Sequence, residues 1–110
     1  MKYILNFTYG IDREILPEWL EWMQRHHLPA VMDTGFFTRA LLIRIPHIKD
    51  NDPAYAVQFE CPGSDSLKAY YREHAPVLQS AVSNRFPGKV AVFGTELEVI
   101  AELNAGEGVK

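Results

Sequence analysis

The 110-residue sequence predicts an α+β fold, in which a four-stranded antiparallel sheet carries two helices on one face. Three observations lead to this prediction. Four segments are rich in β-branched and aromatic residues, and two longer segments carry apolar residues at helical spacing. Glycine, proline and aspartate separate these segments. The shares of apolar residues, 47%, and of charged residues, 23%, are those of a globular protein, and the length suits a single domain over residues 1–100.

The first half of the chain predicts a strand, a helix and a second strand. Residues 2–9 alternate between apolar and other side chains, and Gly10 ends this strand. Helical spacing then continues over residues 14–32, and Gly35 follows as part of a stop signal. Residues 36–46 are dense in phenylalanine, leucine and isoleucine, which is typical of a strand.

The second half repeats this pattern in the same order. Residues 47–53 contain three Asp or Asn residues and predict a hairpin loop, and residues 54–61 predict the third strand. Helical spacing returns over residues 65–85, and residues 89–100 predict the last strand. Residues 101–110 have little to bury and are expected to be a frayed tail.

The resulting order, βαββαβ, is that of the ferredoxin-like split βαβ motif. Its helices cover one sheet face only, yet two strands carry large apolar side chains on both faces. The second strand places one set on one side, Phe37, Leu41, Ile43 and Ile45, and another set on the opposite side, Phe36, Ala40 and Leu42. The fourth strand shows the same two-sided pattern. A second copy of the sheet is the simplest cover, so we expect a homodimer formed through the sheet face.

Composition excludes several classes of protein. The net charge of −3 provides no basic surface for a nucleic acid, so no such partner is expected. Cys61 is the single cysteine, which excludes an intrachain disulfide and fits a reducing compartment. The N-terminal segment makes a poor signal peptide, and no apolar run approaches the roughly 18–20 residues of a membrane span. We therefore expect a cytoplasmic protein that is not bound to membranes.

Each predicted helix aims a histidine at the sheet. In the first helix the apolar stripe contains Leu16, Leu20, Met23 and Ala30, with Trp19 and Val31 at its margins. His27 falls inside this stripe. His74 holds the corresponding place in the second helix, where Leu67, Leu78 and Ala81 form the stripe.

A proline follows two residues after each of these histidines. Pro29 and Pro76 each remove a helical N–H donor, which bends or ends a helix. A kink or break is therefore expected near Pro76. Such a distortion beside an inward-facing histidine can open a gap between helix and sheet, which predicts a pocket.

The predicted pocket suits acid–base chemistry, because burial holds an imidazole neutral and able to take up a proton. His27 and His74 are the candidate catalytic residues. The candidate substrate-binding residues are Trp19, Met23, Tyr70, Tyr71, Arg39 and Arg85. Each has a structural alternative as well, since histidines and aromatic residues on apolar faces often serve packing and Arg85 can extend to solvent. No metal or cofactor is expected, because metal-ligand motifs and a phosphate loop are missing from the sequence.

Several motifs resemble a small bacterial family of domains of unknown function. They are Glu18-Trp19-Leu20-Glu21-Trp22-Met23, His27-Leu28-Pro29-Ala30-Val31, Thr34-Gly35-Phe36-Phe37, Glu73-His74-Ala75-Pro76 and Arg85-Phe86-Pro87-Gly88-Lys89. That family is similar to the dimeric α–β barrel proteins, which pair two ferredoxin-like sheets face to face. Relatives in this superfamily include cofactor-free monooxygenases, isomerases, dehalogenase-like proteins and some haem enzymes. The resemblance implies a dimer and a pocket between helices and sheet, and no particular activity.

Three functional hypotheses follow. The first is a small cofactor-independent enzyme that acts on a small organic molecule through histidine acid–base chemistry. The second is a non-catalytic module that binds a small molecule, and the third is a protein-interaction dimer without a pocket. The paired histidine and proline favour the first two over the third.

Overall fold

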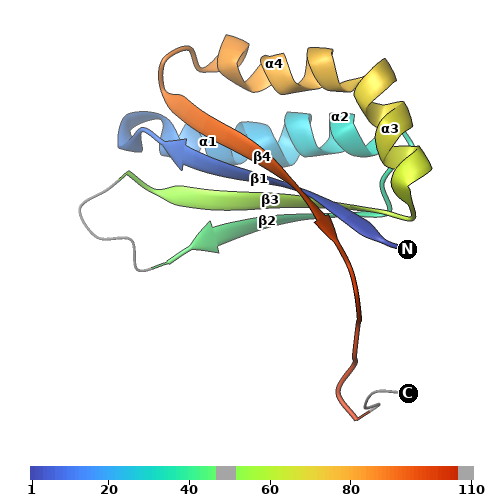
Figure 1. The fold of residues 1–110 in the computed structure, drawn as a ribbon. Helices are drawn as coiled ribbons and strands as arrows, with labels where there is room; N and C mark the ends of the chain where they lie inside the picture. The colour runs from blue at the N-terminus through green and yellow to red at the C-terminus, as the bar shows by residue number, and fades with distance from the viewer. Residues whose placement is uncertain (47–51, 107–110) are drawn as a thin grey trace.

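The computed structural model describes residues 1–46 and 52–106. In this part of the chain a layer of helices lies on one face of a four-stranded sheet (Figure 1). The strands are β1 (Tyr3–Ile11), β2 (Arg39–Ile45), β3 (Ala54–Cys61) and β4 (Val90–Glu98). The helical segments are η1 (Arg13–Ile15), α1 (Leu16–Trp22), η2 (Met23–His27), α2 (Leu28–Met32), α3 (Ser64–Glu73) and α4 (Ala75–Arg85).

The strand order is β2-β3-β1-β4, and every neighbouring pair is antiparallel. This confirms the predicted α+β, ferredoxin-like βαββαβ fold. Figure 1 shows α1 and α2 side by side with α4 on the same face of the sheet. The opposite face carries no helix within the described residues, so this face of the sheet is uncovered. The edge strands of the sheet are β2 and β4.

The core lies between the helices and the two central strands. On β1 the inward residues are Leu5, Tyr9 and Ile11, each at most 3% exposed. On β3 alternate residues are buried, as the pleat of a strand requires: Tyr55, Val57, Phe59 and Cys61. The side chains of two residues paired across antiparallel strands lie on the same face of the sheet. The register therefore determines which residues of the edge strands face the helices.

Most element boundaries agree with the sequence predictions, with two shifts. β1 continues to Ile11, because Gly10 pairs with both neighbouring strands instead of ending the ladder. β2 begins at Arg39, so Phe36 and Phe37 precede it. The side chain of Phe37 is buried and lies 4.7 Å, centroid to centroid, from the ring of Tyr70. It therefore packs under the helices, and its predicted place beside Leu41 on the opposite face was wrong.

The second helical segment breaks where its proline predicted. α3 ends at Glu73, His74 leaves helical geometry with φ −129°, and α4 begins at Ala75 with Pro76 in its first turn. A proline in a first turn costs no hydrogen bond, because that N–H has no partner in any helix. The break changes the direction of the helix between α3 and α4 (Figure 1).

The chain leaves the sheet after β4 and extends away from it (Figure 1). The Val99 N–H donates to the Lys2 carbonyl at 2.9 Å, and Lys2 Nζ lies 3.1 Å from Glu102 Oε1. These contacts hold the start of the predicted tail. Residues 47–51 of the predicted loop and 107–110 of the predicted tail lie outside the described residues. None of the helices in residues 1–46 and 52–106 has the length and apolar character needed to cross a membrane.

Candidate functional site

His27 occupies the last position of a π-helical turn. The residues Met23–His27 form this turn, and the Leu28 N–H donates to the carbonyl of Met23, five residues earlier. Pro29 has no N–H, and in a regular helix its ring would crowd the carbonyl of Arg25. A π turn before the proline reroutes the hydrogen bonds at this place, and such turns often occur at functional sites.

The π turn also changes which residues of this helix face the sheet. The buried residues Trp19, Met23, His27 and Val31 follow one another at intervals of four. A regular α-helix would drift by about 40° at each such step. The extra residue in the π turn offsets this drift, so Val31 is buried and Ala30 is exposed. The helical wheel, which placed Ala30 in the stripe, was wrong beyond the turn for this reason.

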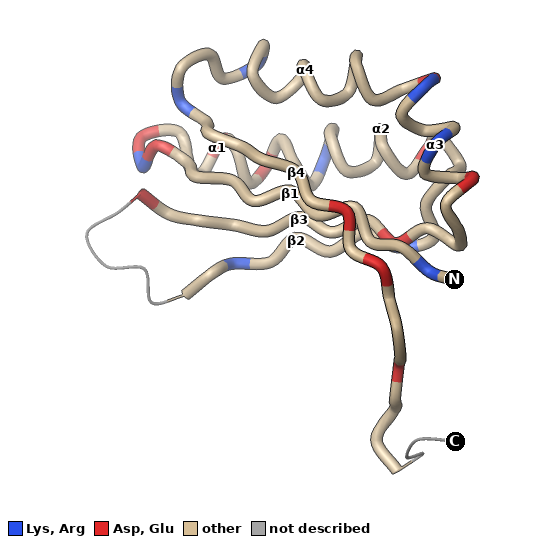
Figure 2. Tube along the Cα trace, viewed as in Figure 1, with Lys and Arg blue, Asp and Glu red and all other residues tan. Residues whose placement is uncertain are grey.

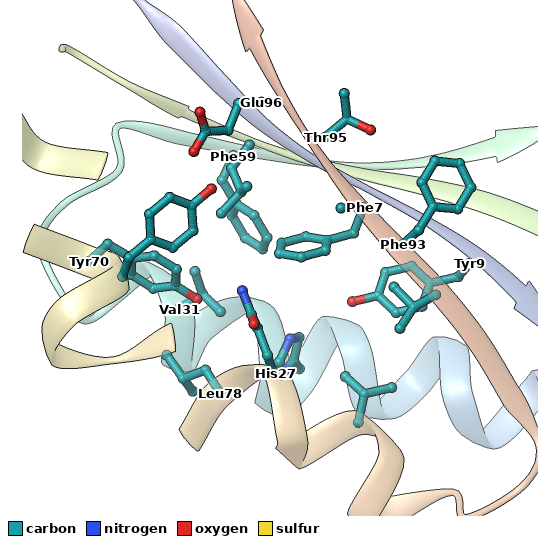
Figure 3. Close-up of a pocket in the computed structure, with 16 residues that line it drawn as sticks. Phe7, Tyr9, His27, Val31, Phe59, Tyr70, Leu78, Phe93, Thr95 and Glu96 are labelled. Atoms are coloured by element: carbon teal, nitrogen blue, oxygen red, sulfur yellow. The ribbon is translucent and has the colours of Figure 1, made fainter. Parts of the chain in front are cut away.

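A cavity of about 470 Å³ lies between the helices and the β1–β4 side of the sheet (Figure 3). That volume is typical of small-molecule sites. Its aromatic lining consists of Phe7, Tyr9, Phe59, Tyr70 and Tyr71, and Phe93 borders it from the edge strand β4, although the register places Phe93 on the opposite face of the sheet. Its aliphatic lining consists of Leu5, Val31, Leu78, Val82 and Val92, next to Gly94. The remaining lining residues are polar: His27, Gln79, Thr95 and Glu96.

The imidazole of His27 is buried and neutral. It is 6% exposed and stacks on the indole of Trp22, with centroids 5.1 Å apart and planes 19° from parallel. Burial lowers the pKa of His27 to about 4. The imidazole is therefore uncharged at neutral pH and presents one nitrogen as a donor and the other as an acceptor.

The tyrosines around the cavity remain protonated. Burial raises the pKa of Tyr70 to about 12 and raises that of Tyr9 still further. The pKa of Tyr71 is raised first by burial and then by the hydrogen bond that its hydroxyl makes with the side chain of Glu96. All three hydroxyls thus act as hydrogen-bond donors and acceptors at neutral pH, and none is ionised.

The predicted site residues separate into those at the cavity and those elsewhere. His27, Tyr70 and Tyr71 line it. Trp19 and Met23 are 0% exposed, and Trp19 packs in the core between Tyr9 and Tyr55, 5.3 Å from each ring.

The two predicted arginines point to the surface. Arg39 Nη1 lies 3.8 Å from Glu60 Oε1, and Arg85 Nη2 lies 3.7 Å from Glu18 Oε2. Arg85 also borders a shallow hollow beside Trp22 and His26, separate from the cavity. Neither arginine is among the residues that line the cavity.

His74 does not occupy a place equivalent to that of His27. It lies at the break between α3 and α4, 5.7 Å from the ring of Phe36 and 6.4 Å from that of Tyr70. The cavity lining does not include it. The reason is the different effect of the two prolines, since Pro29 follows a π turn inside a continuous helix and Pro76 begins a new one.

Sequence reasoning missed the part of the lining that comes from β1, β4 and α4. One signal was available for Gly94, because a glycine within a predicted strand often marks a close approach by another group, and Gly94 stands opposite Phe7. A Cβ atom at Gly94 would lie 3.1 Å from Cε1 of Phe7, so the glycine leaves room for that ring. No comparable signal marks Glu96, whose partner Tyr71 comes from the helix layer.

Within residues 1–46 and 52–106, no group of three or more His, Cys, Asp or Glu side chains is arranged to hold a metal ion. The cavity instead offers one neutral imidazole, several hydroxyls, an amide and a carboxylate among aromatic rings. This set can bind an aromatic or apolar molecule and exchange a proton with it.

Comparison with known proteins agrees with this fold. A family model described as a domain of unknown function (DUF4286) matches residues 2–100. No curated protein matches the chain. A dimeric ferredoxin-like protein from an uncultured marine organism superposes with a TM-score of 0.70 at 8% identity, over 94% of this chain and 99% of that one.

Two further solved structures share the fold. SnoaB, a cofactor-independent oxygenase from Streptomyces nogalater, gives a TM-score of 0.69 at 14% identity, over 93% of this chain and 96% of that one. The haem-degrader MhuD of Mycobacterium tuberculosis gives a TM-score of 0.67 at 16% identity, over 93% of this chain and 99% of that one. Identities this low establish a common fold and carry no activity to this chain.

Proposed function

Because this chain belongs to the DUF4286 family, whose function is unknown, we propose a function from its own cavity. The protein is a small cofactor-independent enzyme that binds a small aromatic or apolar molecule between its helices and sheet. It acts on that molecule by proton transfer with His27. The observation that carries this proposal is the neutral, buried imidazole in the wall of an aromatic cavity.

The energetics of proton transfer to His27 are compatible with catalysis. A ligand hydroxyl with a pKa of about 10 would give its proton to this imidazole at a cost of about 8 kcal/mol. A turnover of about ten per second corresponds to a total barrier of about 16 kcal/mol. The transfer therefore fits within the barrier, and attraction between the new imidazolium and the ligand anion reduces its cost. A similar fold in a cofactor-independent oxygenase supports chemistry of this kind.

The test is conversion of hydroxylated aromatic compounds, such as naphthols and dihydroxynaphthalenes, in air without added cofactor. Product formation is followed by liquid chromatography and mass spectrometry. We expect the wild type to convert at least one compound and His27→Gln to convert it roughly 100-fold more slowly or worse. His26→Gln is the matched control, because His26 belongs to the same π turn but is exposed. Equal rates for the wild type and His27→Gln would contradict the role of His27.

A second candidate function is binding without catalysis. The pKa of about 4 at His27 favours it, because a base this weak takes up protons rarely at neutral pH. Compounds that bind in the cavity and are recovered unchanged would support this alternative.

The uncovered sheet face supports a homodimer as the form in which the protein acts. Ile43, Leu97 and Phe93 are 36%, 38% and 63% exposed, and the register places all three on the face opposite the helices. Exposed apolar patches of this kind mark interaction surfaces. Two marine proteins of the same fold are described as dimeric.

Polar side chains at the centre of that face can set how two copies align. Gln58 Nε2 donates to Asn6 Oδ1 at 3.3 Å, and Asn6 Nδ2 donates to Thr8 Oγ1 at 3.4 Å. Light scattering after gel filtration should give about twice the 12.6 kDa chain mass. Ile43→Arg should reduce it to that of one chain, whereas Val77→Arg, at a 73% exposed position on α4, should not. A monomeric wild type would contradict the dimer.

A further inference from the structure

We propose that Glu96 makes the cavity selective for uncharged or cationic aromatic molecules that carry an O–H or N–H donor, and that it excludes carboxylates and phosphates. This inference rests on the proposed function in one respect, namely that the cavity holds a small molecule. It adds the class of molecule and the residue that selects it.

The register directs Glu96 toward the helix layer. Glu96 stands opposite Leu5, whose side chain is buried under the helices, and antiparallel partners share a face. The Tyr71 hydroxyl, from α3, is hydrogen-bonded to the Glu96 side chain. A carboxylate accepts this bond, so Tyr71 holds Glu96 at the cavity from the opposite layer.

Among the described residues that line the cavity, Glu96 is the one charged side chain. No Lys or Arg occurs among the described residues that border the cavity, and His27 is neutral there. β4 carries two acidic residues, Glu96 and Glu98, and no basic one, and Figure 2 shows the acidic positions toward the end of this strand. The two arginines predicted from the sequence to bind substrate, Arg39 and Arg85, lie against Glu60 and Glu18 instead. An anionic ligand would therefore meet a like charge and no compensating cation.

The cavity has a polar group at each end and aromatic rings between them. Figure 3 shows Glu96 on the sheet side, His27 on the helix side, and Phe7 and Phe59 in between. The edges and faces of such rings favour a flat aromatic ligand. A donor on that ligand would point at Glu96, because a carboxylate can only accept hydrogen bonds.

The test compares three probes with one aromatic frame at pH 7.5: 2-naphthol, 2-naphthylmethylammonium and 2-naphthoate. Their dissociation constants are measured by isothermal titration calorimetry. We expect the wild type to bind the naphthol and the ammonium at least about tenfold more tightly than the naphthoate, since repulsion at a partly solvated site is worth about that factor. In Glu96→Gln the dissociation constants of the naphthoate and the naphthol should agree within about threefold, and the ammonium should no longer bind more tightly than the naphthoate.

Glu98→Gln is the matched control, because Glu98 lies two residues further along β4 and does not line the cavity. It should keep the wild-type order of affinities. Equal binding of naphthoate and naphthol by the wild type, or an unchanged ratio in Glu96→Gln, would overturn the selectivity and leave the cavity function intact. Failure of all three probes to bind would overturn both.

Discussion

The buried imidazole of His27 makes the stability of this protein depend on pH in a defined way. In the unfolded chain the ordinary pKa of 6.5 applies, and in the folded protein the pKa is about 4. Between these values the unfolded chain holds the extra proton, so the free energy of unfolding falls as the pH falls. The full effect, present above pH 6.5 and lost below pH 4, is about 3 kcal/mol.

The perturbation that isolates this effect is His27→Gln, which removes the titrating group and keeps a polar side chain. Urea unfolding followed by tryptophan fluorescence gives the stabilities of wild type and variant at pH 7.5 and pH 4.5. Between pH 7.5 and pH 4.5 we expect the wild type to lose about 2.5 kcal/mol more of its free energy of unfolding than His27→Gln loses. Protein concentration is held constant, because association alters apparent stability.

The exposed neighbour His26 provides the control for this experiment. His26→Gln should run parallel to the wild type over the whole range. Parallel curves for the wild type and His27→Gln, within about 0.5 kcal/mol, would refute the burial of a neutral imidazole at this position.

Three further predictions concern single side chains. Trp19→Ala should cost about 3–5 kcal/mol in urea unfolding, because the indole is 0% exposed and packs as core. Gly94→Ala, whose Cβ would lie 3.1 Å from the Phe7 ring, should cost about 1 kcal/mol and weaken 2-naphthol binding severalfold; unchanged binding would mean that Phe7 does not shape the cavity. Asp12 accepts a hydrogen bond from the Glu14 N–H at 2.9 Å, so Asp12→Ala should lower the stability in urea unfolding and Asp12→Asn should preserve most of it.

The fold was predictable from the sequence because each element carries its own local signal. A segment rich in β-branched and aromatic residues identified β3 over Ala54–Cys61 at its observed bounds, and Pro76 identified the break between α3 and α4. These signals act within a few residues, so neighbours in the sequence suffice to recognise them. The family resemblance, carried by motifs between Glu18 and Lys89, agrees with the match of the family model to residues 2–100.

The site was predictable only in part, because it depends on distances that the sequence does not contain. Local spacing placed His27 inside, but it could not foresee the π turn that buries Val31 in place of Ala30. It treated His74 as an equivalent, although the helix break leaves this residue outside the cavity lining.

The sequence by itself determined the order of elements, the two-sided apolar sheet and the inward-facing His27. Only the tertiary structure decided what His27 faces. The pairing of β4 with β1 brings Glu96 and Gly94 beside a helix layer whose contributing residue, Tyr71, lies 25 positions away from Glu96 in the chain. Contacts of such long range follow from packing and register, and no local pattern encodes them.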